Sequence, residues 1–401
     1  MNDKIRIAII GCGEFAKEFI PIFKAHPYVE KIFVCDKIKE KALEYQKKFD
    51  VEVIDTFEDA LNRKDVNAIA IFVQRHLHGP FAIKALNAGK NVYSAVPMAS
   101  EVSHCKEIID VVKRTGLTYM MGETCVYYPC SIYCKKEHAK GTFGKFVYAE
   151  SQYIHDIEHF GPNAENNPEL AVPPLYYSTH SLGMVLNALD THVTKVSALG
   201  TIDHVDGGIY RKGNNIWDNE FSNEFSFMQL ANGGIVRINE CRRMGYKAPS
   251  SFISSFYGTD GAYQYNNAQH LVTTKTKQGV NLKDVSEEVS SYQMNEHRSD
   301  IDFKERVANH AWAWDSYSPV QQDEYERLPN ELKSLSQNGH MASHQFLIDD
   351  FCQATYKGEM PKVNAWVAAR FTIPGLIAHE SAKQGGVMLD VPDFGDAPKK
   401  V

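Results

Sequence analysis

The sequence predicts an α/β protein of two domains: an N-terminal doubly wound parallel sheet, followed by an α/β domain with a largely antiparallel sheet. Three observations lead to this prediction. At 401 residues the chain is too long for one ordinary core. Up to residue 122, continuous apolar runs alternate with helical periodicity, as in parallel strands that helices cover on both faces. Beyond it the apolar runs half-alternate between Asn-Gly and Gly-Gly turns, as in antiparallel sheets.

The first domain is expected over residues 1–122. Ile5–Ile10 is an unbroken apolar run, and a helical stretch follows it directly. Gly89 closes a later helix, because glycine readily adopts the left-handed conformation that ends helices. In chain order, the expected strands are 5–10, 32–35, 68–73, 91–94 and 117–122, and the expected helices are 14–26, 37–49, 79–89 and 105–116.

The second domain is expected over residues 123–401. Its strand-like runs cover residues 144–156, 195–205, 223–243 and 250–266. Residues 273–337 are polar and receive no assignment. Two helices, expected over 344–358 and 364–386, close the chain, and the last is expected to pack back on the first domain.

Composition limits the classes of partner. A net charge of −7 argues against a nucleic-acid partner, which needs a basic face. No apolar run reaches the roughly 18 residues of a membrane helix. No secretory signal pattern is visible either, so no membrane partner and a cytoplasmic location are expected. The eight cysteines lack paired C-x-x-C spacing and are expected to be free and buried.

A glycine-rich loop predicts a dinucleotide site. The stretch "IAIIGCGEFA" places G-x-G-x-x-A directly between a strand and a helix, as in a Rossmann domain. The first glycine allows the tight turn, and the second lets the backbone approach a pyrophosphate. The helix N-terminus then offers amides to the phosphates. The loop residues expected at the cofactor are Gly11, Cys12, Gly13, Glu14 and Phe15.

Asp36 is expected to set the cofactor preference. It ends the second strand, where a carboxylate accepts hydrogen bonds from both ribose hydroxyls. An acid there repels a 2′-phosphate, so NAD is favoured over NADP, and the neighbouring Lys37 softens that preference.

Two further loops open on the same edge of the predicted sheet. "FVQRHLHGP" follows the third strand, and a hydrogen bond at the helix start is the alternative for its second histidine. The lip after the fourth strand holds no ionisable group. The residues of these loops expected at the cofactor are Val73, Gln74, Arg75, His78, Ala95, Val96 and Pro97.

These features together carry a family resemblance. The G-x-G-x-x-A loop, Asp36, the loop ending in His78 and "ALNAGKNVYSAVPMA" resemble the Gfo/Idh/MocA oxidoreductases, and the closing "NAWVAARFTIPGLIAHESAKQGG" also fits. The chain departs from the family at its Glu-Lys-Pro signature, where Ala95-Val96-Pro97 stand. The lysine to which proton transfer is usually assigned in that family is therefore absent.

Segments of the second domain resemble a branch that also lacks this lysine. "ETCVYY", "YIHD" and "LYYSTHSLG" are similar to the NAD-dependent α-N-acetylgalactosaminidases and to enzymes that oxidise C3 of glucosides. The resemblance implies a sugar or glycoside substrate, bound by the second domain. A homo-oligomer is expected, with the sheet of that domain as its contact face.

His180, Tyr177 and Tyr127 are the expected catalytic residues. Apolar spacing predicts a helix capped by Ser178 or Thr179, with His180 in its first turn. The helix dipole there disfavours imidazolium, which suits His180 to accept a hydroxyl proton. Backbone hydrogen bonding is the alternative for this histidine, and an ordinary core position is the alternative for Tyr127.

Glu123, His155 and Asp156 are expected to bind substrate. His155 and His159 have the H-x-x-x-H spacing of metal ligands. Strand-like residues before them favour a polar sugar-binding wall instead, so no metal is expected. Further candidates, for which solvated surface is the alternative, are Arg242, Arg243, His340 and His344.

Three functions are compatible with these residues. The first is transfer of a hydride between a sugar or glycoside hydroxyl, C3 first of all, and nicotinamide. The second is glycoside hydrolysis in which tightly bound NAD acts catalytically through a 3-keto intermediate. The third is a non-catalytic NAD-binding regulator, which the missing lysine permits.

Overall fold

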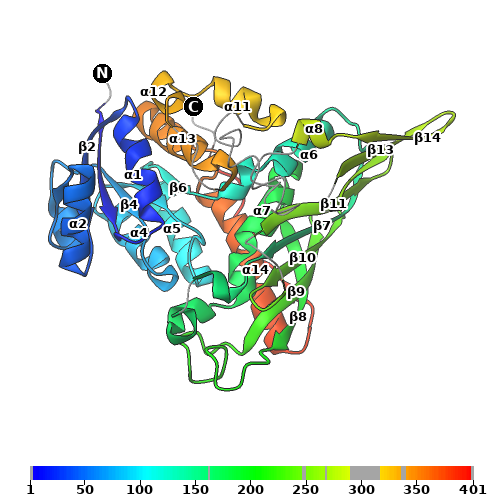
Figure 1. The fold of residues 1–401 in the computed structure, drawn as a ribbon, viewed down its shortest axis with the longest axis horizontal. Coiled ribbons are helices and arrows are strands. Elements are labelled where there is room, and N and C mark those ends of the chain that lie inside the picture. The colour runs from blue at the N-terminus through cyan, green and yellow to red at the C-terminus, as the bar shows by residue number, and fades with distance from the viewer. Residues whose placement is uncertain are drawn as a thin grey trace, which may run out of the picture. The chain divides into compact units, whose positions relative to one another are not determined.

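The computed structural model describes residues 3–160, 163–245, 250–266, 269–289, 317–335 and 340–398 (Figure 1). The chain divides into two compact units. Unit 1 comprises residues 1–124, 324–369 and 394–401, and unit 2 comprises residues 125–323 and 370–393. The expected division at residue 122 therefore differs for residues 324–369, which group with the N-terminal sheet and not with the second domain.

Unit 1 is built on a six-stranded parallel sheet, which confirms the predicted doubly wound fold. The strand order is β3-β2-β1-β4-β5-β6. It changes direction between β1 and β4, the switch point outside which open α/β sheets bind ligands. The strands are β1 (Ile5–Ile10), β2 (Val29–Cys35), β3 (Glu52–Val53), β4 (Ala68–Ile71), β5 (Asn91–Ser94) and β6 (Tyr119–Met121).

Two short elements of this unit escaped the sequence prediction. β3 has only two residues, too few for a recognisable apolar run, and it pairs with β2 at the sheet edge. The six-residue helix α3 (Phe57–Asn62) begins at Thr56, whose side chain accepts a hydrogen bond from Asp59 N at 3.0 Å. The other helices of this unit are α1 (Ala16–Ala25), α2 (Lys39–Phe49), α4 (His78–Asn87), α5 (Val102–Thr115), α12 (Asn330–Lys333) and α13 (Ser343–Lys357).

Helix α13 explains why residues 324–369 belong to unit 1. It contacts α1 and β1 and lies beside α1 in Figure 1. Phe346, Leu347 and Ile348 are fully buried. Phe351 packs edge-on against Tyr93 of β5, with the ring centroids 5.7 Å apart. Burial of these apolar side chains on the face of the parallel sheet gives this late segment its place.

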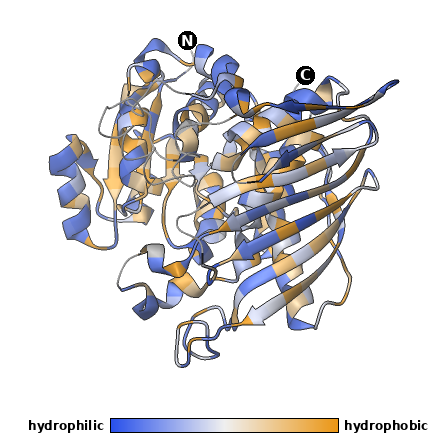
Figure 2. Ribbon diagram, turned by 45° about the vertical axis from the view of Figure 1, so that its right-hand side comes forward, coloured by the Kyte–Doolittle hydropathy of each residue, from blue (hydrophilic) through white to orange (hydrophobic). Residues whose placement is uncertain are grey.

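Unit 2 is built on a nine-stranded, mostly antiparallel sheet, as predicted. Its order is β14-β13-β12-β11-β7-β10-β9-β8-β15, and β7–β10 is its parallel pair. Figure 2 shows hydrophobic and hydrophilic residues alternating along these strands, as in a sheet with one buried face. The strands are β7 (Phe146–Ile154), β8 (Val193–Ile202), β9 (Phe221–Leu230), β10 (Ile235–Cys241), β11 (Ser250–Gly258), β12 (Gly261–Tyr265), β13 (His270–Thr276), β14 (Gly279–Asp284) and β15 (Leu389–Asp390).

Within the region that received no assignment, residues 273–284 belong to this sheet, whereas residues 317–335 hold the short helices α11 (Gln322–Glu326) and α12. Residues 273–289 complete β13 and form β14 and α8 (Ser286–Val289), and residues 290–316 lie outside the described residues. Helix α14 (Ala365–Lys383) closes the chain's helical part, and only its residues 365–369 group with unit 1. Residues 370–383 of this helix group with unit 2, and its expected packing on the first domain stays a prediction.

Helices α6 (Pro129–Ala139) and α7 (Ser178–Leu189) pack against each other in unit 2. α7 contacts β7, β10 and β11, and Leu182 and Val185 are fully buried. The expectation of a Ser178 or Thr179 cap is wrong, because Tyr177 is the N-cap residue. The 3-10 turn η6 (Pro174–Tyr177) runs directly into the helix, so both hydroxyl residues already lie in its first turn.

The cysteines and the helices bear on two predictions from composition. All eight cysteines are free and buried, which confirms their expected place. Among the described residues, no helix combines the length and the apolar character that crossing a membrane requires.

Candidate functional site

The glycine-rich loop between β1 and α1 has the shape of a pyrophosphate cradle. Gly11 has a φ of 98°, and a Cβ there would collide with the carbonyl oxygen of Phe72, so a side chain is excluded. A Cβ built on Gly13 meets no described atom within 4 Å. The open space at Gly13 lets a ligand approach the backbone, as a dinucleotide requires.

The start of α1 offers amides to an anion. Phe15 is the N-cap residue, and among the described residues no side chain caps the helix. Glu14 and Phe15 are exposed, whereas Cys12 is buried. Uncapped first-turn amides and the positive end of the helix dipole bind phosphate oxygens. The loop residues therefore fit the pyrophosphate of NAD.

Asp36 connects the glycine-rich loop to the loop after β2. Its Oδ2 accepts a hydrogen bond from Cys12 N at 2.7 Å, and its Oδ1 accepts one from Ile38 N at 2.8 Å. Each carboxylate oxygen has a second lone pair, so these bonds still allow Asp36 to accept ribose hydroxyls. Lys37 is exposed. Burial, followed by the charge of Asp36, raises the pKa of the Cys12 thiol to about 12, so Cys12 stays protonated.

The loops after β4 and β5 meet at His78. Its Nδ1 lies 2.8 Å from the carbonyl oxygen of Pro97, and its Nε2 lies 3.1 Å from that of Val73. His78 is 1% exposed, and burial lowers its pKa to about 4, although both carbonyls act in the opposite direction. When neutral, the His78 ring can donate a hydrogen bond to only one of these two carbonyl oxygens, and it fills the space between the two loops.

The rest of these two loops stays accessible. Val73, Gln74 and Arg75 are partly exposed. Ala95 and Val96 are half-buried, and the Val96–Pro97 peptide is cis. Because the strands are parallel, these loops follow the carboxyl edge of the same sheet as the phosphate cradle, as predicted. The lip carries no group that can exchange a proton.

A second cluster of predicted residues lies in unit 2, around His180. This residue is in the first turn of α7 and is 6% exposed. Its ring centroid lies 4.8 Å from that of Tyr153 of β7, in an edge-on contact, and 5.8 Å from that of Tyr177 of η6, in a tilted contact. The two tyrosine rings stack with their centroids 6.3 Å apart. The guanidinium of Arg242 lies over both tyrosines, 5.0 and 5.2 Å from the ring centres. We call Tyr153, Tyr177, His180 and Arg242 the His180 cluster.

Arg242 is held by a buried charge pair. Its Nη2 lies 3.5 Å from Oε2 of Glu240, which is fully buried on β10. Ser181 of α7 donates a hydrogen bond to the other oxygen of Glu240. Burial lowers the pKa of Arg242, but Glu240 and the nearby tyrosines more than offset this and raise the pKa above its usual value. The cluster therefore contains a permanent, desolvated positive charge.

The turn that carries Tyr177 is fixed by neighbours in the same unit. Glu224 of β9 accepts a hydrogen bond from Leu175 N at 2.8 Å, and its other oxygen lies 2.6 Å from Nδ1 of His379. A Cβ on Gly375 would collide with the carbonyl oxygen of Leu175, so only glycine allows α14 to approach the turn this closely. These contacts fix the backbone of the turn that carries Tyr177.

The remaining predicted residues have different surroundings. The hydroxyl of Tyr153 and Nδ1 of His155 share a hydrogen bond of 2.7 Å, which connects His155 to the His180 cluster. Asp156 accepts hydrogen bonds from the amides of Glu158 and Met244, so both of its oxygens hold backbone. The side chain of His159 lies outside the described residues.

Two predicted residues are deeply buried. Tyr127 is 2% exposed in unit 2, and its carbonyl accepts a hydrogen bond from Gln321 at 2.9 Å. Glu123 is fully buried in unit 1, just past the end of β6.

Sequence reasoning missed Tyr153 and Glu240 and left Arg242 and Arg243 open. The surface alternative is wrong for both arginines, because Arg242 is 3% exposed and the buried Arg243 side chain pairs with Glu165 and Asp203. A signal was present in β10, where Val236, Ile238 and Glu240 share the buried face. A carboxylate at an inward position of an alternating strand predicts a buried partner cation.

The fold defines the class of this protein. It has two units, and the first is a Rossmann-type parallel sheet with a glycine-rich loop at its switch point. Residues 5–123 match the family GFO_IDH_MocA, described as an oxidoreductase family with an NAD-binding Rossmann fold. This match confirms the resemblance predicted from the motifs, and it confirms NAD as the type of cofactor.

Similar proteins match nearly the whole chain. A glycosyl hydrolase family 109 protein of Streptomyces filamentosus is 24% identical over 97% of this chain and 77% of its own length. Levoglucosan dehydrogenase, solved with NADH and levoglucosan, superposes with a TM-score of 0.74 at 17% identity over 97% of this chain and all of its own. Myo-inositol 2-dehydrogenase of Lactobacillus plantarum superposes with a TM-score of 0.66 at 17% identity, over 97% of this chain and all of its own. These structures share the fold of both units.

We expect the protein to bind NADH at least tenfold more tightly than NADPH, a difference of about 1.4 kcal/mol. The Asp36 carboxylate accepts ribose hydroxyls and repels a 2′-phosphate. Asp36→Asn removes the charge, so it should narrow the ratio of NADH affinity to NADPH affinity. It should also weaken the binding of NADH, because one of the two hydrogen bonds from backbone amides is lost. Fluorescence titration of both nucleotides measures this. Lys37→Gln keeps Asp36 but removes the cation expected to soften the preference, so it should widen the ratio of the two affinities, and equal affinities in the unaltered protein would contradict the assignment.

His78 should make stability depend on pH. Its pKa is near the ordinary 6.5 in the unfolded chain and about 4 in the folded one, so the unfolded state binds the proton first. The unfolding free energy therefore falls as pH drops from 6.5 towards 4, by about 3 kcal/mol in all. Urea unfolding at several pH values should show a smaller loss for His78→Gln than for the unaltered protein. The exposed His204→Gln serves as the control, and parallel curves for His78→Gln would refute the prediction.

Proposed function

We propose that the chain is an NAD-dependent oxidoreductase that transfers a hydride between a sugar or glycoside hydroxyl carbon, C3 of the ring first of all, and nicotinamide. The observation that carries the proposal is His180, a buried imidazole between two tyrosine rings with a fixed cation nearby. Aromatic faces beside polar groups suit a sugar ring, which has both apolar and hydroxyl surfaces. Sugar dehydrogenases among the similar structures support this substrate class.

His180 is the proposed base for the reacting hydroxyl. Oxidation of a hydroxyl requires its proton to leave as hydride departs from the carbon, and histidine is the usual side chain for this transfer. Arg242 stabilises negative charge that develops on the substrate oxygen, because it is permanently charged and desolvated. Tyr177 and Tyr127 position the hydroxyl. Glu123, His155 and Asp156 are proposed to bind the other hydroxyls.

The apolar lip of unit 1 supports this distribution of tasks. Ala95 and Val96 stand where the resembled family carries glutamate and lysine, so the lip can shape a nicotinamide pocket but cannot move a proton. NAD, when bound, supplies the hydride acceptor. The proton acceptor must then come from elsewhere in the chain, and His180 is the proposed source.

A second candidate function is redox-neutral glycoside hydrolysis. Its support is the likeness to glycosyl hydrolase family 109 proteins over nearly the whole chain. Oxidation at C3 would acidify the proton on C2, a base would remove that proton, and the aglycone would leave from C1. Water would then add, and the hydride would return to C3. Tyr127 is the proposed second base in this sequence of steps.

One assay separates these functions. The purified protein is incubated with NAD and a panel of nitrophenyl glycosides and free sugars, while NADH absorbance and nitrophenol release are followed together. Net NADH formation supports the oxidoreductase. Nitrophenol release without net NADH supports the hydrolase, and neither signal with any substrate would favour a non-catalytic NAD-binding regulator and overturn the proposal.

His180→Asn should reduce kcat about a hundredfold to ten-thousandfold, the usual cost of losing a positioned base. NADH affinity should change little, because the cradle for NAD belongs to unit 1 and His180 to unit 2. Tyr177→Phe keeps the ring beside Arg242 and should cost less. Steady-state kinetics and NADH titration check both expectations. His204→Asn is the matched control, and a His180→Asn enzyme with nearly full kcat would remove His180 from the mechanism.

A further inference from the structure

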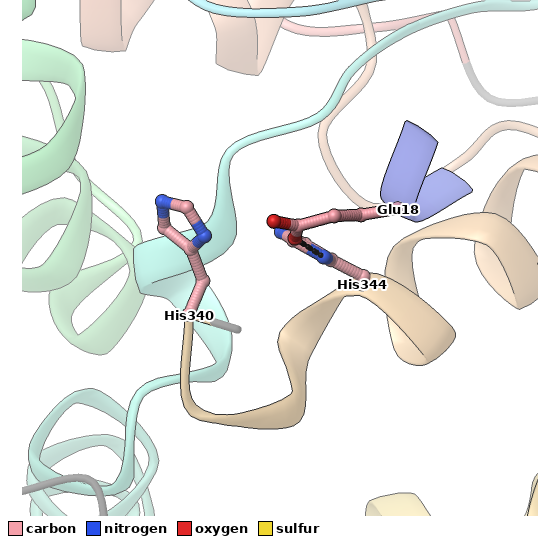
Figure 3. Close-up of side chains that lie close together, drawn as sticks. All are labelled: Glu18, His340 and His344. Carbon is pink, nitrogen blue, oxygen red and sulfur yellow. Dashed lines mark ion pairs between the residues drawn. The ribbon is translucent and has the colours of Figure 1, made fainter. Parts of the chain in front are cut away.

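Unit 1 holds a cluster of metal-type ligands that neither the cofactor nor the proposed catalysis uses. Glu18 lies in the first turn of α1, His340 lies in the short turn η8 (His340–Ala342), and His344 is the second residue of α13. One donor atom from each side chain lies within 4.8 Å of the others. Figure 3 shows the carboxylate of Glu18 against the ring of His344, with His340 facing them.

The burial of His344 is the central observation. Its side chain is fully buried, and its Nδ1 lies 3.1 Å from Oε2 of Glu18. Within the part of the chain that the structure describes, neither ring nitrogen of His344 makes a hydrogen bond. A buried polar group without a hydrogen bond is unfavourable unless another ligand satisfies it. A bound cation would satisfy a ring nitrogen directly.

The backbone at His340 is unusual in the same place. His340 and Met341 have φ values of 54° and 52°, in the left-handed region that non-glycine residues rarely adopt. The helical spacing of His340 and His344 is thus interrupted by a kink. Such conformations persist where surrounding interactions or a bound group compensate for them.

Aromatic rings surround the cluster. Phe19 packs on the ring of His344 at 4.4 Å, and Phe15 contacts both histidines at 5.6 Å. An apolar shell around polar ligands limits access of water and strengthens their interaction with a cation. Phe15 also belongs to the phosphate cradle, so the cluster adjoins the NAD loop within unit 1.

We infer that Glu18, His340 and His344 form a binding site for a divalent metal ion of the zinc class. Two imidazoles and one carboxylate are ligands of Zn²⁺ and related transition metals, whereas Mg²⁺ and Ca²⁺ prefer oxygen ligands alone. Ligands of a tetrahedral zinc stand roughly 3.4 Å apart, since the bonds are about 2.0–2.2 Å. The Glu18–His344 separation already meets this requirement. Three protein ligands leave a fourth position for water or a small ligand.

An ion pair between Glu18 and His344 alone is the competing explanation. It needs no contribution from His340, and it predicts no uptake of metal. The two explanations therefore differ in what substitution of His340 does to metal affinity.

The test uses the full chain, freed of metal with a chelator and then dialysed, without NAD or substrate. Zn²⁺ is titrated by calorimetry, and Co²⁺ by visible absorption, whose bands report tetrahedral ligation. We expect one equivalent of Zn²⁺ per chain, a higher Tm with the metal, and no comparable binding of Mg²⁺. His340→Gln and His344→Gln should each lower the affinity for Zn²⁺ at least tenfold and remove the absorption bands of bound Co²⁺.

Two further variants keep the test decisive. Glu18→Gln changes a half-exposed side chain, so it should fold and still lose affinity if His344→Gln proves unstable. His204→Gln removes an exposed imidazole outside the cluster and should bind like the unaltered protein. Zn²⁺ uptake that is equal in all variants, or absent from the unaltered chain, would overturn the site. Because the readout needs no turnover, it is independent of the proposed function.

Discussion

The buried pair of Glu240 and Arg242 is the constraint on which the candidate site of unit 2 depends. Glu240 is fully buried on β10, receives the hydroxyl of Ser181 from α7 and faces Arg242, which lies over Tyr153 of β7 and Tyr177 of η6. One charge pair thereby connects two strands, a helix and a turn around His180. Loss of one partner of such a pair usually costs about 3–5 kcal/mol, because the other charge stays buried alone. In the proposed function, the residues that stabilise this unit would also recognise the substrate.

In unit 1, Asp36 likewise combines a structural role with a proposed binding role. The carboxylate suited to ribose hydroxyls also holds the amides of Cys12 and Ile38 and so fixes the conformation of two loops. His78 lies between the loops after β4 and β5, where its ring packs between the carbonyl oxygens of Val73 and Pro97. The edge of the sheet is thus organised by polar side chains that bind backbone first. A ligand would meet loops that are already in place, which lowers the entropic cost of binding.

The absence of an ionisable group at the Ala95-Val96 lip gives the two units different chemistry. Unit 1 offers a glycine-rich loop, the Asp36 carboxylate and an apolar lip, whereas unit 2 offers an imidazole, phenols and a guanidinium. In the proposed reaction, one unit handles the cofactor and the other handles the proton and the sugar. Both redox chemistry and redox-neutral hydrolysis begin with the same removal of a hydroxyl proton, so one arrangement of residues serves either outcome.

The sequence by itself determined the features that depend on neighbouring residues. Continuous apolar runs identified β1, β4 and β5, and the G-x-G-x-x-A loop and Asp36 followed from their places beside strands. His180 and Tyr177 were found as a short motif. Only the tertiary structure decided that Tyr153 and Arg242 surround His180 and Tyr177. It also decided that Glu240 is the buried counter-charge of Arg242 and that α13 joins unit 1. Periodicity reports which face of an element is buried, whereas contacts between distant segments depend on strand order and register, which no local pattern encodes.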